Sequence, residues 1–223
     1  MIDSKFQNFI VTSNTNDPKS ELKEEMLYKL ILGIRSFFKD SFVVLSDSYY
    51  ISKRIVDLTD FTLIDRSYKQ FSYHGYPEMQ LVKNGLSLLN RYGKNYHYRI
   101  TYDFIMNEDN ISAYIDWASK INDSTRLVFA KDNGHDSGVK TNVWFGENQL
   151  IENIIPNEMN HLETDFYKQI QKLNYSDKTF LYENSDEMFH GNINTYDLIG
   201  HGGTSFREEK IEYFKKYYES HRL

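Results

Sequence analysis

The chain has 223 residues, which corresponds to one domain at the usual domain size. Its formal charge of −6 argues against a nucleic-acid-binding surface, since phosphate contacts require a basic face. The chain has no cysteine, which excludes thiol nucleophiles, disulfide frameworks and cysteine-based zinc sites. No apolar run approaches the roughly 20 residues of a transmembrane segment, and the N-terminus lacks the features of a signal peptide. The sequence therefore predicts a soluble, cytoplasmic protein with no transmembrane segment.

Short apolar runs alternate with amphipathic segments over the first 130 residues. The run 9–12 ends in a polar stretch that reaches Pro18, which is typical of a buried strand opening into a loop. The amphipathic segments keep the 3.6-residue period of helices. The predicted strands are residues 9–12, 42–45, 61–64, 96–105 and 126–130. The predicted helices are residues 21–38, 51–58, 77–93 and 111–118.

The pattern loosens after about residue 131, where residues 149–155, 159–173 and 207–219 have a helical spacing. Strands that alternate with helices at these distances favour parallel βαβ units. We therefore expect an α/β fold with a mostly parallel central sheet and helices on both faces.

Polar residues follow the predicted strands, where ligands bind in open α/β sheets. They are Thr12, Ser13, Asn14, Asp47, Asp65, Asp103, Lys131 and Asp132. Neither a G-x-G-x-x-G fingerprint nor a phosphate-binding G-x-x-x-x-G-K-[ST] loop is present, which disfavours NAD-type redox chemistry and P-loop hydrolysis. A phosphate bound here would instead be neutralised by Mg²⁺ or Mn²⁺ on carboxylate oxygens.

Asp103 lies within the apolar stretch 98–105 and shares one face with Arg99 and Thr101 by two-residue alternation. A carboxylate in such a stretch is costly unless it is paired or binds a metal. Two interpretations stay open: a structural aspartate that caps the next loop or pairs with Arg99, and a metal ligand.

The order of these features resembles that of small GT-A-type nucleotide-sugar glycosyltransferases, which modify capsules and lipopolysaccharides in bacteria and some viruses. The resemblance rests on strands that end at Thr12-Ser13-Asn14 and at Asp47, a helix with Lys83-Asn84, and a strand that delivers Asp103. The segment 141–147 resembles the acceptor-side strand and turn of such enzymes, and residues 161–167 resemble the helix that follows. The likeness spans residues 6 to about 205 and is one of order and spacing.

The resemblance implies a single GT-A-like domain, with a donor half in residues 1–110 and an acceptor half in residues 111–223. It implies transfer of a sugar from a nucleoside-diphosphate sugar to a hydroxyl acceptor. Residues 12–14 would form the floor of the nucleotide site, and Asp47 would contact the base or the ribose. Lys83 and Arg99 would be further donor contacts, and Glu163 or, second, Asp132 would be the catalytic base. The alternative for Glu163 is an exposed carboxylate that the helix dipole favours.

One departure from the family concerns the metal. These enzymes usually carry Asp-x-Asp, whereas this chain has Thr101-Tyr102-Asp103. A single Asp103 could hold Mn²⁺ or Mg²⁺ if His201 supplied a second ligand. Otherwise the enzyme is metal-independent, or the chain is a degenerate module that binds a sugar or a protein. A related nucleotidyl- or phosphosugar-processing enzyme is the other alternative.

Overall fold

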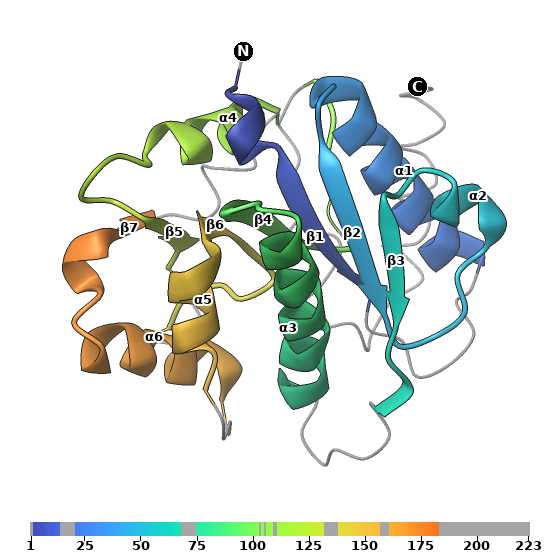
Figure 1. The fold of residues 1–223 in the computed structure, drawn as a ribbon. Helices are drawn as coiled ribbons and strands as arrows, with labels where there is room; N and C mark the ends of the chain where they lie inside the picture. Colours follow the sequence, from blue (N-terminus) through green and yellow to red (C-terminus); the bar gives the residue numbers. More distant parts are fainter. Residues whose placement is uncertain are drawn as a thin grey trace, which may run out of the picture.

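The computed structural model of the chain describes residues 2–13, 21–67, 75–102, 104, 106–108, 111–131, 138–156 and 161–182. Seven strands form one sheet in the order β3-β2-β1-β4-β6-β5-β7 (Figure 1). The strands are β1 (Asn8–Ser13), β2 (Phe42–Asp47), β3 (Phe61–Ile64), β4 (Tyr96–Thr101), β5 (Leu127–Ala130), β6 (Val143–Glu147) and β7 (Thr179–Tyr182).

The sheet is mostly parallel, which confirms the expectation from the sequence. β1 pairs in parallel with β2 and β4, β2 with β3, and β5 with β7. β6 is the exception, since it runs antiparallel to both of its neighbours, β4 and β5. Because of this reversal, the residues that precede β6 lie at the edge where the parallel strands end.

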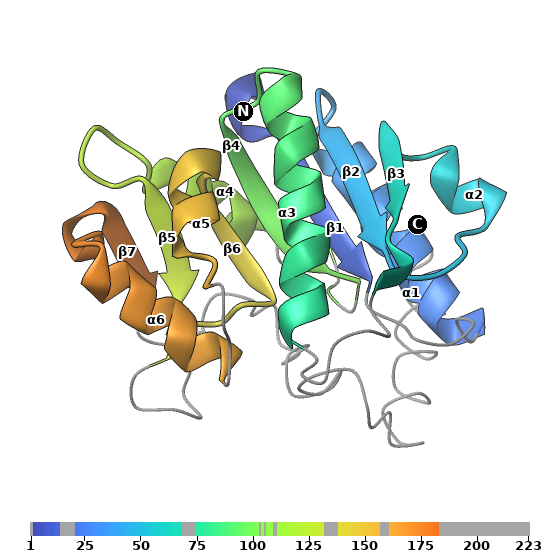
Figure 2. The same ribbon diagram turned by 60° about the horizontal axis from the view of Figure 1, so that its bottom comes forward.

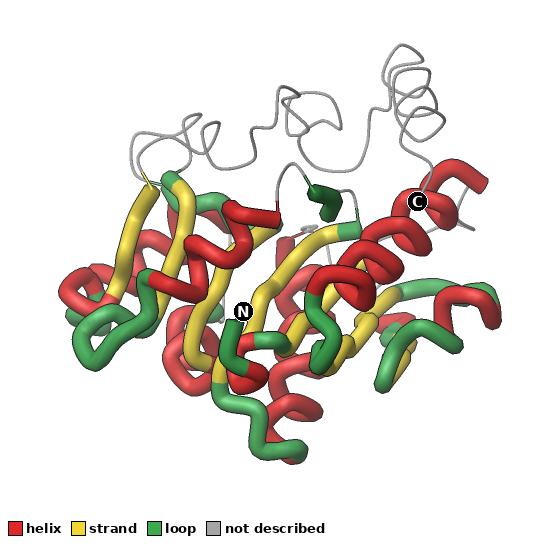
Figure 3. Tube along the Cα trace, turned by 90° about the horizontal axis from the view of Figure 1, so that it is seen from above, coloured by secondary structure: helices red, strands yellow, loops and turns green. Residues whose placement is uncertain are grey.

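Helices cover both faces of the sheet (Figures 2 and 3). Phe9 points to one face, where its ring centroid lies 5.0 Å from that of Phe38, just beyond the end of α1. Its neighbour Ile10 points to the other face and packs against Gly85 of α3. The helices are α1 (Glu21–Phe37), α2 (Lys53–Val56), α3 (Gly75–Arg91), α4 (Ile111–Ser119), α5 (Asn148–Ile154) and α6 (Leu162–Lys172).

The sequences of the central strands are continuous apolar runs, because helices cover both faces of these strands. Every residue of β1 is buried, as are Val43, Val44 and Leu45 of β2. β3 at the edge of the sheet is only partly buried. None of the helices in the described part of the chain is long and apolar enough to cross a membrane.

The structure shortens one predicted strand and adds a strand that was not predicted. β4 ends at Thr101 and not at residue 105, because a backbone hydrogen bond from Phe104 to the Thr101 carbonyl turns the chain there. β7 was not predicted, although Thr-Phe-Leu-Tyr is a run of strong strand formers. The terminal helix predicted over 207–219 lies outside the described residues.

The sheet has a topological switch point between β1 and β4. The chain leaves β1 for β2 and β3 on one side, and then returns through α3 to β4 on the other side. Ligands bind at the carboxyl ends of the strands beside such a point. Thr12 of β1 lies opposite Thr101 of β4 at this position.

Candidate functional site

The carboxyl edge of the sheet brings three of the predicted nucleotide contacts together. Ser13, the last residue of β1, pairs with Asp47, the last residue of β2. Thr12 lies one residue earlier, and all three side chains are buried. One Asp47 oxygen, Oδ1, accepts a hydrogen bond of 2.7 Å from the backbone N–H of Tyr49, which fixes the carboxylate at the strand end.

Arg99 lies directly beneath the switch point on the face that α3 covers. Its guanidinium is fully buried and donates from Nη2 to the Thr12 hydroxyl at 3.1 Å and to the carboxylate of Glu78. The guanidinium also stacks 5.1 Å from the ring centroid of Trp144. The predicted donor contact Arg99 is therefore next to Thr12. Glu78 is a residue that the sequence reasoning missed, and its only signal was its place in the first turn of the helix before β4.

Glu163 reaches the same edge of the sheet from the second half of the chain. It lies in the first turn of α6 and is half-buried. Its Oε1 accepts a hydrogen bond of 3.2 Å from Thr141, and its carbonyl accepts one from the N–H of Val139. Asn142, the residue after Thr141, accepts a hydrogen bond from the backbone of Thr101. Glu163 is thus partly buried and bonded to the strand-end segment, not an exposed helix-end carboxylate.

Lys83 is not brought to the strand ends. α3 turns about 100° per residue, so Lys83 lies about 160° around the helix from Gly85, two residues later. Gly85 faces Ile10 of the sheet, and Glu78, seven residues earlier, shares the side of Gly85. Lys83 is therefore on the side of α3 that faces away from the sheet. The other strand-end carboxylate, Asp65, has a local role, since it accepts hydrogen bonds from Ser67 and Asn84. The side chain of Ser67, above all, and then its backbone and Asn84 lower the pKa of Asp65, although burial acts in the opposite direction.

Four of the predicted site residues lie outside the described residues: Asn14, Asp103, Asp132 and His201. They include both predicted metal ligands. Within the described part of the chain, no group of three or more His, Asp or Glu side chains could hold a metal ion.

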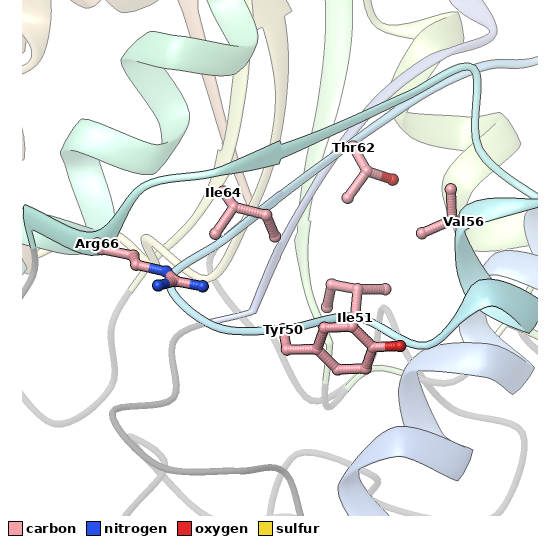
Figure 4. Close-up of a pocket in the computed structure, with 6 residues that line it drawn as sticks. All are labelled: Tyr50, Ile51, Val56, Thr62, Ile64 and Arg66. Atoms are coloured by element: carbon pink, nitrogen blue, oxygen red, sulfur yellow. The ribbon is translucent and has the colours of Figure 1, made fainter.

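A cleft of about 520 Å³ lies beside Asp47, between β3, α2 and the segment that follows β2 (Figure 4). Tyr50, Ile51, Val56 and Ile64 give it an apolar lining, and Arg66 lies at its end near the strand terminus. Ile64 is the residue of β3 that pairs with Asp47. Tyr50 is 68% exposed, which makes it the most exposed large apolar side chain among the described residues. The cleft was not predicted, because its walls come together only when β3 pairs with β2.

A series of buried hydrogen bonds lies on the same face of the sheet as Arg99. The Trp144 indole N–H donates to Nε2 of His97 at 2.9 Å, and Nδ1 of His97 lies 2.8 Å from Oδ1 of Asn148. Burial, opposed by the bond to Asn148 and aided by the charge of Arg99, lowers the pKa of His97 to about 4. His97 is therefore neutral at pH 7 and has no role as a general acid there.

No protein-family model matches the sequence, and no curated protein is significantly similar to it. Solved structures do match the fold. The 4-diphosphocytidyl-2C-methyl-D-erythritol synthase from Anaerococcus prevotii superposes with a TM-score of 0.63 over 97% of this chain and 100% of that one, at 11% identity. An active-site mutant of LgtC matches with a TM-score of 0.53 over 97% and 96% of the two chains, at 8% identity. A nucleotide-diphospho-sugar transferase from Desulfovibrio desulfuricans G20 matches with a TM-score of 0.50 over 81% and 80%, at 7% identity.

The chain has the GT-A-like nucleotide-diphospho-sugar transferase fold. This confirms the fold that the order of strand-end residues implied. Proteins with this fold include a 4-diphosphocytidyl-2C-methyl-D-erythritol synthase as well as a nucleotide-diphospho-sugar transferase, so the reaction has to be argued from the site.

Proposed function

We propose that the protein is a glycosyltransferase that moves a sugar from a nucleoside-diphosphate sugar to a hydroxyl acceptor. One observation carries the proposal. Glu163, from the second half of the chain, is tied through Thr141 to the edge at which the first half presents Thr12, Ser13 and Asp47. Transfer from a donor to an acceptor requires a catalytic base and contacts to the donor nucleotide. Here one half of the chain supplies the carboxylate and the other half supplies the nucleotide contacts.

In this reaction the acceptor oxygen attacks the anomeric carbon, and the bond from that carbon to the diphosphate oxygen breaks. The electron pair of that bond leaves with the diphosphate, and Glu163 takes the proton of the acceptor hydroxyl. Thr12 and Ser13 form the floor of the nucleotide site, and Asp47 contacts the base or the ribose. We further propose that Asp103 and His201 hold Mn²⁺ or Mg²⁺, which would neutralise charge on the leaving diphosphate.

The segment that follows β1 favours a diphosphate donor over a triphosphate. Residues 14–20, between β1 and α1, contain no glycine, and the charges of Asp17 and Lys19 cancel. A nucleoside triphosphate carries more negative charge and is usually held by a glycine-rich backbone or by basic side chains. This composition supports glycosyl transfer over nucleotidyl transfer.

The test identifies the phosphate-containing product that the protein releases. The protein is incubated with a panel of nucleotide sugars, simple sugar acceptors and Mn²⁺, and release of nucleoside diphosphate is measured. Glu163→Gln should lower kcat by about 100-fold or more with little change in the donor KM, because a general base acts in the transition state. Glu152→Gln, which alters an exposed carboxylate of α5, is the matched control and should retain full activity. Equal activity in Glu163→Gln and wild type would contradict the assignment of the base.

Nucleotidyl transfer is the second candidate. It is favoured by the superposition on the 4-diphosphocytidyl-2C-methyl-D-erythritol synthase, which covers that chain completely. The two reactions differ in what they release. A nucleotidyltransferase given a nucleoside triphosphate and a sugar phosphate releases pyrophosphate, whereas a glycosyltransferase releases a nucleoside diphosphate. Pyrophosphate release with no turnover of nucleotide sugars would replace our proposal with this one.

A further inference from the structure

The guanidinium of Arg99 has more donors than acceptors around it. Nη2 serves both Glu78 and Thr12, whereas Nε and Nη1 find no hydrogen-bond partner within the described part of the chain. The side chain is fully buried, so these N–H groups have also lost contact with bulk water. Buried donors are almost always satisfied in native proteins, and a charged group left unsatisfied is especially costly. Among the described residues, the site therefore lacks an acceptor for these two donors.

Two hydroxyls beside Arg99 point to the same missing acceptor. Thr12 accepts from Arg99, which leaves its own hydroxyl proton available to a further group. Thr101 lies opposite Thr12 on β4, and its buried hydroxyl is likewise unpartnered among the described residues. Arg99 and Thr101 are two residues apart on β4 and so share a face. The switch point thus presents an arginine and two hydroxyls that can all donate.

We propose that Arg99, Thr12 and Thr101 form an oxyanion site that takes a phosphate group of the nucleotide substrate. The identity of that phosphate rests on the proposed function, in which it belongs to the donor's diphosphate. Arginine and hydroxyl donors are the usual partners of phosphate oxygens. Glu78 is a positioning residue in this site. Its carboxylate holds Nη2, and with 19% of its side chain exposed it connects the buried pair to the protein surface.

The sign of the Glu78 effect distinguishes this site from a purely structural ion pair. Glu78 neutralises the charge that attracts the anion. Removing that charge while keeping the shape, as in Glu78→Gln, should therefore strengthen phosphate binding. A structural pair predicts only a loss of stability when either partner is changed.

The experiment is a calorimetric titration of the whole chain with inorganic pyrophosphate, an anion that carries neither base nor sugar. We expect Glu78→Gln to bind pyrophosphate about 3- to 10-fold more tightly than wild type, and Arg99→Met to bind it at least about 10-fold more weakly. The matched control is Glu147→Gln. Glu147 forms a similar half-buried pair with Arg126 at the opposite edge of the sheet, and its substitution should leave the affinity unchanged.

Arg99→Met could lose its fold, so the result for Glu78→Gln stands as an independent test. Unchanged or weaker pyrophosphate binding in a folded Glu78→Gln protein would overturn the proposal. The proposed phosphate site and the proposed function can be rejected independently of each other. Arg99-dependent pyrophosphate binding without sugar transfer would keep the site and reject the transferase. Sugar transfer with pyrophosphate binding that does not depend on Arg99 would do the reverse.

Discussion

At the scale of single residues, the hydrogen bonds of His97 fix its tautomer. An indole N–H can only donate, so Nε2 of His97 must accept from Trp144 and the proton must lie on Nδ1. Nδ1 then donates to Oδ1 of Asn148, whose amide nitrogen donates to Asn90 and to the carbonyl of Lys94. This chain of bonds joins β4, β6, α5 and the end of α3, and it works only with a neutral imidazole.

The neutral state of His97 predicts a loss of stability in mild acid. Its pKa is about 4 in the folded protein against 6.5 for the ordinary group, so the folded protein binds fewer protons than the unfolded chain between these values. The stabilisation is complete above pH 6.5 and is lost as the pH falls towards 4. The full loss amounts to about 3 kcal/mol at 1.36 kcal/mol per pKa unit. Urea unfolding at pH 7, 6, 5 and 4.5 measures it.

The control for this effect is the exposed His161. His161→Gln should keep the dependence of stability on pH, whereas His97→Gln should be less stable at pH 7 and lose most of that dependence between pH 6.5 and 4.5. A pH profile that is the same in His97→Gln and in wild type would show that another group is responsible.

At the scale of elements, the contact between α1 and the segment after β4 depends on a glycine. A Cβ placed at Gly33 would collide with the carbonyl oxygen of Met106, which is backbone and cannot rotate away. Met106 lies shortly after the end of β4, so α1 contacts the chain close to the strand end at which the candidate site lies. The close approach therefore couples helix packing to the geometry of the site.

Gly33→Ala should destabilise the protein although alanine favours helices. The helix propensity gained is about 1 kcal/mol, whereas a clash with the backbone forces a shift that typically costs about 1–3 kcal/mol or more. We expect a net loss of about 1–2 kcal/mol in the free energy of urea unfolding, as a balance of these two effects. Ser36→Ala, at an exposed position of the same helix, should be neutral or slightly stabilising. A more stable Gly33→Ala protein would show that α1 and Met106 are not in close contact.

The elements also show what a sequence can predict. β1 and β2 were predictable because both of their faces are buried, which leaves a continuous apolar run. The antiparallel direction of β6 was not derivable from its own residues, because a short strand carries no local signal of its direction. Ser13, Asp47 and Thr12 were predictable from the strand ends alone. Glu78 was not, because its pairing with Arg99 exists only once α3 packs on the sheet.

At the scale of the whole molecule, the reversal of β6 joins the two halves of the chain at one edge. β1 and β2 deliver Thr12, Ser13 and Asp47 there, and the segment before β6 delivers Thr141 with its partner Glu163. Had β6 been parallel, the residues before it would lie at the opposite edge of the sheet. The topology therefore places a candidate base and a candidate nucleotide site at the same edge of the sheet, although they come from distant parts of the sequence.

Ser13 gives the most direct test of our proposal that a nucleoside diphosphate binds at the carboxyl ends of β1 and β2. Its buried hydroxyl has no partner among the described residues, so Ser13→Ala should cost the free protein little stability. Ser46→Ala is the matched control, because Ser46 is also buried and unpartnered there but points to the opposite face of the sheet from Ser13, by two-residue alternation.

The measurement is a calorimetric titration of wild type, Ser13→Ala and Ser46→Ala with UDP, CDP, GDP, ADP and TDP in the presence of Mn²⁺. We expect that one of the diphosphates binds wild type, that Ser13→Ala weakens this binding by about 10-fold through loss of one hydrogen bond, and that Ser46→Ala leaves the affinity unchanged. Binding that is equal in all three proteins, or no binding by any of the five diphosphates, would contradict the proposal.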